Sequence, residues 1–152
     1  MKRLAVTALL TITVLGAASC RKESDPVRAT IDALAEAAGD RDADAAEKLL
    51  AAAYADGEHP DRTAAVLTLR RYFAAYERIS VSFGDVTVDR KPDLARATFT
   101  ATFDGAPRKL GSLDAMLPRS AKVRFEMNLA PEGGAWKVTW AGWRLLSEGD
   151  GP

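Results

Sequence analysis

The residues best suited to acid–base chemistry gather in one short segment. The chain's single histidine, His59, has carboxylates close by at Asp56, Glu58 and Asp61. An imidazole beside a carboxylate can act as an acid–base pair, because histidine titrates near neutral pH. The run 56–61 also contains glycine and proline and is typical of a solvated loop between helices. The sequence favours the loop interpretation, since geometry and not proximity in sequence decides a catalytic role.

Other groups that could do chemistry are few. Three tyrosines, Tyr54, Tyr72 and Tyr76, stand near this segment and could line the mouth of a pocket. One histidine without a second histidine or a nearby cysteine is poor evidence for a metal site. We therefore expect no metal site and no cofactor.

The only cysteine, Cys20, closes a segment with the anatomy of a signal peptide. Residues 1–3 are a short basic start, residues 4–15 are apolar, and residues 16–20 are small. This order is typical of secretion signals. The apolar run is too short, and too soon followed by charges, for a membrane-spanning helix.

The residues Ala17-Ala18-Ser19-Cys20 resemble the bacterial lipobox. The resemblance implies that residues 1–19 are removed and that Cys20 is acylated, palmitate included, and attached to the lipid bilayer. Arg21 after the cysteine favours an outer-membrane protein that faces the periplasm, by analogy with enteric lipoproteins. A stray thiol or an intermolecular disulfide is the alternative. Residues 20–25 then form a lipidated cysteine and a short tether.

Cleavage leaves 133 of the 152 residues, enough for one domain with a real core. We place that domain at residues 26–146 and a flexible tail at 147–152. The whole chain balances 21 basic against 21 acidic residues. A balanced charge gives no electrostatic drive toward nucleic acid.

The first half of the domain has helical periodicity. Asp25 and Pro26 supply a capping acceptor and a proline at the first helical position, and Gly39 is placed to end that helix. A second helix is predicted from Asp42 or Asp44 to residues 56–57, and a third begins near residues 60–61. Apolar stripes at spacings of three and four support the three helices, among them Val27, Ile31, Leu34 and Ala38, then Ala46, Leu49, Leu50 and Ala53, then Val66, Leu69, Phe73 and Tyr76.

From residue 79 the apolar period changes to two. Four segments, 79–88, 95–103, 121–129 and 136–145, alternate apolar and polar residues, as half-buried antiparallel strands do. A change of parity at residues 84–85 predicts a β-bulge in the first strand. A second change, at Gly142, resets the phase of the last strand.

This order predicts an α+β fold, with three N-terminal helices packed on a curved four-stranded antiparallel sheet. The chain here resembles the NTF2-like superfamily, also called the SnoaL-like or cystatin-like cone. The resemblance is carried by residues 39–43 (Gly-Asp-Arg-Asp-Ala), by the third helix running into residues 79–88, and by residues 134–138 (Gly-Ala-Trp-Lys-Val). It implies a cone whose open end often holds a pocket.

The inferred inner face of the strands is apolar. Its residues offer no useful proton carrier, whereas enzymes of this superfamily need interior carboxylates, histidines or tyrosines. This is the main argument against an enzyme. The residues that we expect to line a pocket are Tyr54, Tyr76, Ala97, Phe99, Ala101, Phe125, Met127, Trp136 and Trp140.

Three residues are candidates for contact with a partner. Trp143 follows the phase reset and is expected to be partly exposed. Leu113 and Met116 belong to the segment 105–119, which is long for a hairpin connection. That segment is interpreted as a flap over the sheet edge or the cone mouth, with a lid or partner-binding edge as the alternative.

The first functional hypothesis is a lipid-anchored, non-catalytic envelope domain that binds an apolar small molecule or an envelope protein. The second is a SnoaL or ketosteroid isomerase type of enzyme, an isomerase, dehydratase or hydrolase acting on a small hydrophobic substrate. The third is a self-associating scaffold, so both a monomer and a homodimer remain open.

The anchor can be tested by changing Cys20→Ser. We expect the variant to lose its attachment to lipid, because no acyl chain can then be added. Fractionation of cells measures this directly. A variant that stays firmly in the membrane fraction contradicts the anchor.

Overall fold

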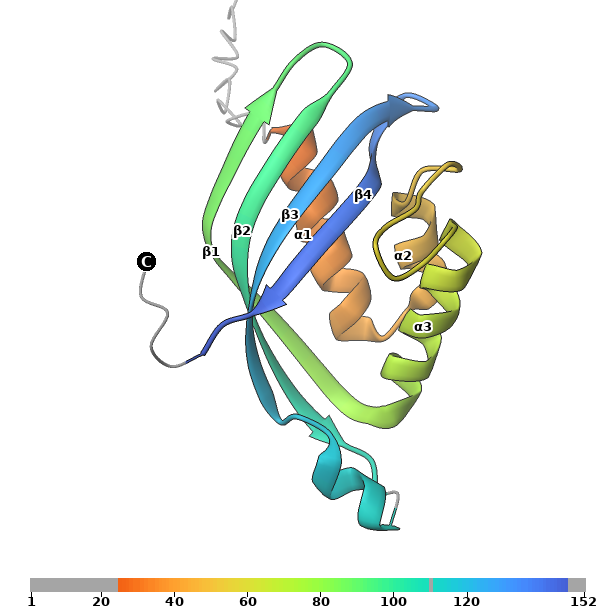
Figure 1. Cartoon of the computed structure of the whole chain (residues 1–152), viewed down its shortest axis with the longest axis vertical. Coiled ribbons are helices and arrows are strands. Elements are labelled where there is room, and N and C mark those ends of the chain that lie inside the picture. The colour runs from red at the N-terminus through yellow and green to blue at the C-terminus, as the bar shows by residue number, and fades with distance from the viewer. Residues whose placement is uncertain (1–24, 110, 148–152) are drawn as a thin grey trace, which may run out of the picture.

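The computed structural model describes residues 25–109 and 111–147 and confirms the α+β architecture. Three helices precede four antiparallel strands (Figure 1). The elements are α1 (Pro26–Asp40), α2 (Ala43–Leu49), α3 (Arg62–Ala75), β1 (Tyr76–Arg90), β2 (Ala95–Pro107), the 3-10 helix η1 (Gly111–Met116), β3 (Ser120–Glu132) and β4 (Ala135–Leu145).

The sheet has the order β1-β2-β3-β4, so each strand pairs with the next along the chain. It curves around α1, and α2 and α3 lie beyond α1 on the side of β4 (Figure 1). The largest fully buried side chains lie between α1 and the concave face of the sheet: Val27, Ile31, Phe99, Leu129 and Val138. The result is a cone with one apolar core.

The start of α1 follows the prediction, but its end does not. Asp25 accepts hydrogen bonds from the backbone N–H groups of Val27 at 2.9 Å and Arg28 at 3.3 Å. The predicted stop at Gly39 is wrong: the helix continues to Asp40, and Arg41 adopts the left-handed conformation with φ 57°. Asp42 then caps α2 at once, which leaves no room for a looser turn.

The second helix is shorter than its apolar pattern predicts. It ends at Leu49, because Leu50 turns extended and forms a parallel bridge with Val138 on β4. The backbone N–H of Ala51 donates to the Val138 carbonyl at 2.8 Å, and that of Ala55 donates to the Thr139 carbonyl at 3.3 Å. Residues 50–55 therefore run along the edge of β4, outside any helix.

The register of the sheet shifts at three places, and two of them bear on the predictions. The predicted bulge in β1 is confirmed, since the register shifts between Gly84 and Thr87 and Asp85 has φ 52°. The predicted phase reset at Gly142 is misplaced, because the irregularity in β4 lies between Val138 and Trp140. Trp140 pairs with Asn128 on the outer face, and cross-strand partners share a face. Trp140 thus points away from the core.

The segment 105–119 does not cover the sheet edge. Residues 105–107 extend β2, and η1 lies past the end of the sheet (Figure 1). Met116 is 80% exposed. Nothing is described of residue 110 or of the Leu113 side chain.

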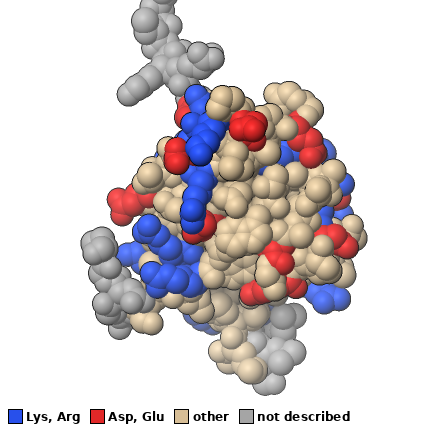
Figure 2. Space-filling view, turned by 45° about the horizontal axis from the view of Figure 1, so that its top comes forward, with Lys and Arg blue, Asp and Glu red and all other residues tan. Residues whose placement is uncertain are grey.

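The surface carries charges of both signs, which lie interspersed on the face that Figure 2 shows. Within the described ranges, no helix is both long and apolar enough to cross a bilayer. Cys20 and the predicted signal segment lie outside the described residues, as do residues 148–152 of the predicted tail.

Within the described residues, the hydrophobic core lies between Val27 and Ala141. A chain that starts at Arg21 therefore keeps every core residue that the structure describes. Since a domain with its own complete core folds as a unit, such a chain is suitable for measurements without detergent.

Candidate functional site

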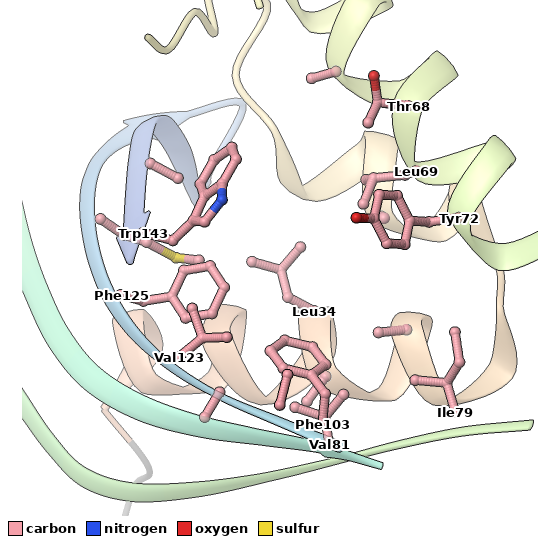
Figure 3. Close-up of a pocket in the computed structure, with 18 of the residues that line it drawn as sticks. Leu34, Thr68, Leu69, Tyr72, Ile79, Val81, Phe103, Val123, Phe125 and Trp143 are labelled. Atoms are coloured by element: carbon pink, nitrogen blue, oxygen red, sulfur yellow. The ribbon is translucent and has the colours of Figure 1, made fainter. Parts of the chain in front are cut away.

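The cone encloses an open cavity of about 520 Å³ between the concave face of the sheet and the helices. Cavities of roughly 300–1,000 Å³ are the usual size for drug-sized ligands. Trp143, Phe125 and Val123 of the sheet face Leu69 and Tyr72 of α3 across the space, and Leu34 of α1 points between them (Figure 3). The lining is mainly aliphatic and aromatic.

Six of the nine side chains predicted to line a pocket do so: Tyr54, Tyr76, Phe99, Ala101, Phe125 and Met127. The other three do not. Ala97 is fully buried in the core, Trp136 packs against the core, and Trp140 faces outward from β4. The bulge after Val138 is the reason for the last of these, because it brings Ala141, Trp143 and Leu145 to the inner face instead.

One wall of the cavity is polar. Four side chains form it, and we call them the polar wall: Tyr54, Asp56, His59 and Thr68. The Tyr54 hydroxyl donates to Oδ2 of Asp56 at 2.5 Å. Nδ1 of His59 lies 3.0 Å from each oxygen of the Asp56 carboxylate. Nε2 of His59 lies 3.0 Å from the Thr68 hydroxyl.

The loop that carries Asp56 and His59 is not solvated at these two positions. The Asp56 side chain is 1% exposed and that of His59 is 12% exposed. The interpretation of 56–61 as a solvated loop is thus wrong for both residues, although Glu58 is exposed as expected. The cause is tertiary: residues 50–55 bond to the edge of β4, and His59 contacts Thr68 of α3.

Asp56 organises the loop through its backbone as well. Its Oδ1 accepts the backbone N–H groups of Glu58 and His59, each at 2.7 Å. An aspartate that binds the N–H groups two and three residues ahead fixes a tight turn. The side chain of His59 is therefore held by the same carboxylate that shapes its backbone.

The environment of the polar wall moves two pKa values apart. Burial tends to raise the pKa of Asp56, but hydrogen bonds from Tyr54, His59 and two backbone amides outweigh it, so the pKa lies below its usual value. Burial, with the adjacent Asp56 carboxylate, raises the pKa of Tyr54 far above its usual value. At neutral pH Asp56 is consequently a carboxylate and Tyr54 a phenol that donates to it.

The ionised carboxylate determines which nitrogen of His59 carries the proton. A carboxylate only accepts hydrogen bonds, so Nδ1 must donate to Asp56. In the neutral ring Nε2 then has a free lone pair, which accepts from the Thr68 hydroxyl. Nε2 of His59 is therefore a hydrogen-bond acceptor at the cavity, and the ring that carries it is held in one orientation.

The polar wall corrects the expectation that the hollow offers no proton carrier. The inward-facing strand residues are apolar as predicted, and Asp104 of β2, which also contributes to the lining, is exposed. The segment between α2 and α3, however, supplies a carboxylate and an imidazole. Thr68 was not anticipated. It falls three residues after the buried Ala65 and one before Leu69, so its helical spacing places it on the inner face of α3.

Two further residues that the sequence singled out lie at the exposed side of the cavity. Trp143 is 41% exposed and lies at the cavity, with its ring centroid 6.3 Å from that of His59 and 6.4 Å from that of Phe125. Tyr72 also lines the cavity, at its exposed side. Among the described residues no cluster of histidine, cysteine and carboxylate groups is suited to hold a metal ion.

The role of Asp56 in stability can be tested with Asp56→Asn. We expect unfolding to cost about 1–3 kcal/mol less at neutral pH, because hydrogen bonds to a buried charge are lost. The folded-state pKa of Asp56 is lowered, so its stabilisation is present above the unfolded pKa and is lost as pH falls through the folded one. The difference from the parent chain should therefore shrink below about pH 4.

Denaturant unfolding at several pH values measures this, with Asp85→Asn as the control. Asp85 is an exposed carboxylate at positive φ, where asparagine is equally suited. A difference for Asp56→Asn that does not change with pH would show that its charge is not what stabilises the loop.

No family model and no curated protein matches the sequence. Solved structures do resemble the fold. One is a protein from Streptomyces avermitilis that has been suggested to be a dehydratase of the NTF2-like family. It aligns with TM-score 0.68 and 18% identity, over 80% of this chain and 95% of that one.

An NTF2-like superfamily protein from Salmonella enterica aligns with TM-score 0.68 and 9% identity, over 82% of this chain and 91% of that one. Bd1075 from Bdellovibrio bacteriovorus aligns with TM-score 0.66 and 8% identity, over 79% of this chain but 40% of that one. Similarity at such low identity establishes the fold alone. The domain therefore has the NTF2-like, or cystatin-like, cone fold that the sequence predicts.

Proposed function

We propose that the chain is a lipid-anchored protein of the bacterial cell envelope whose domain binds a small, largely apolar molecule inside the cone. The observation that carries the binding function is the cavity itself. It has the volume of a ligand site and walls built mainly of aliphatic and aromatic side chains. An apolar molecule gains free energy there in proportion to the apolar area that leaves water.

The cellular location rests on the sequence. The signal segment and the small residues before Cys20 support export and acylation, and Arg21 supports the outer membrane facing the periplasm. The tether that follows is short, so the open cone would stay close to the lipid surface. An apolar molecule could then pass between the bilayer and the cavity over a short distance.

Acid–base catalysis is a second candidate, favoured by the contact between Asp56 and His59. A carboxylate that orients an imidazole leaves Nε2 ready to take a proton from a bound molecule. The dehydratase suggested for the Streptomyces avermitilis protein belongs to this class of chemistry. An envelope protein is a further candidate partner, with the exposed Trp143 and Met116 as contacts.

Filling the cavity tests the binding function. Leu34→Trp places a larger side chain at a position that points into the space (Figure 3). We expect the affinity for the uncharged fluorescent probe N-phenyl-1-naphthylamine to fall by about tenfold or more, since the probe and the indole compete for one volume. Fluorescence titration of the chain from Arg21 onward measures it.

Leu67→Trp is the matched control, because Leu67 lies on α3, is 49% exposed and does not line the cavity. Thermal unfolding checks that both variants fold. Equal affinity of the parent chain and Leu34→Trp would mean that the probe does not bind in the cone.

A further inference from the structure

The charged groups at the cavity are all acidic in the part of the chain that the structure describes. Asp56, Glu58 and Asp104 contribute to the cavity lining, and of the three only the Asp56 side chain is buried; no described lysine or arginine lines it. The Asp56 carboxylate is ionised and buried, so its field is weakly screened by water. An anionic molecule in the cavity would face like charge, and Nδ1 of His59 is already bonded to Asp56.

Nε2 of His59 is the polar atom best placed to receive a ligand. Its hydrogen-bond partner, the Thr68 hydroxyl, stands at the edge of the cavity and is only half-buried. A helical threonine can instead donate to the carbonyl four residues earlier, here that of Ala64. Thr68 can thus give up Nε2 without leaving its own hydroxyl unsatisfied.

The neighbours of His59 favour a ring-shaped molecule. Trp143 lies tilted at 30° to the imidazole, and Phe125 lies next to Trp143. A flat ring in the cavity can contact both aromatic side chains while one substituent reaches His59.

We propose that the molecule bound in the cavity is an uncharged apolar alcohol or phenol, whose hydroxyl donates to Nε2 of His59 in place of Thr68. This inference rests on the proposed binding function. The polar wall then selects among apolar molecules: it accepts a hydroxyl and rejects a carboxylate. A molecule without any polar group binds through its area alone and leaves Thr68 on His59.

Three probes with one ring system test the selection: naphthalene, 1-naphthol and 1-naphthoate. Titration calorimetry of the chain from Arg21 onward at neutral pH gives the affinities. We expect 1-naphthol to bind about 3–10-fold more tightly than naphthalene, the worth of one net hydrogen bond. We expect 1-naphthoate to bind more weakly than both.

Two variants locate the effect. His59→Leu should abolish the preference for 1-naphthol over naphthalene. Thr68→Val keeps the shape of the side chain and removes the competing hydroxyl, so it should tighten 1-naphthol about threefold and leave naphthalene unchanged. If Thr68 serves only to fasten the loop, Thr68→Val will not improve the affinity for 1-naphthol, and the inference is overturned.

The outcomes separate the two levels of the proposal. Equal binding of naphthalene and 1-naphthol, or tighter binding of 1-naphthoate, overturns the selection while the binding function stands. Binding of none of the three overturns the binding function itself.

Discussion

The Asp56 carboxylate is the interaction on which the arrangement of the site depends. It is almost fully buried, yet it accepts from the Tyr54 hydroxyl, from Nδ1 of His59 and from two backbone amides. A buried charge is tolerated only when it is paired or richly hydrogen-bonded, and this carboxylate meets that condition. Without this carboxylate, the turn at Glu58 and His59, the His59 ring and the Tyr54 hydroxyl would all lose the hydrogen bonds that hold them.

The path of the chain after α2 brings Asp56 to this place. Leu50 leaves the helix to pair with Val138, and the next residues follow the edge of β4. This arrangement covers an edge strand whose N–H and C=O groups would otherwise be unpaired. It also brings Tyr54, Asp56 and His59 to a cavity whose other walls are mainly apolar. The same backbone segment thus pairs with part of the edge of β4 and supplies polar side chains to the cavity.

The regular elements were predictable because their signals are local. Alternation along 95–103 and 121–129 places Phe99 and Leu129 inside, and the parity change at residues 84–85 marks a real bulge. The end of α2, the bulge after Val138 and the burial of Asp56 were not predictable in this way. Each is decided by contacts between residues far apart in the chain, such as Leu50 with Val138. The polar composition of 56–61 is typical of a surface loop. It does not indicate that the preceding residues pair with the edge of β4 or that Asp56 is buried.

The central claim is that Asp56 fixes the proton of His59 on Nδ1 and leaves Nε2 as an acceptor toward the cavity. The chain has a single histidine, so nitrogen-15 NMR of the imidazole gives one unambiguous set of signals. The spectrum should be recorded at several pH values, and the position of the proton is read from the form of the ring that carries only one. We predict a protonated Nδ1 and an unprotonated Nε2. A proton on Nε2, or rapid averaging between both forms, would contradict it.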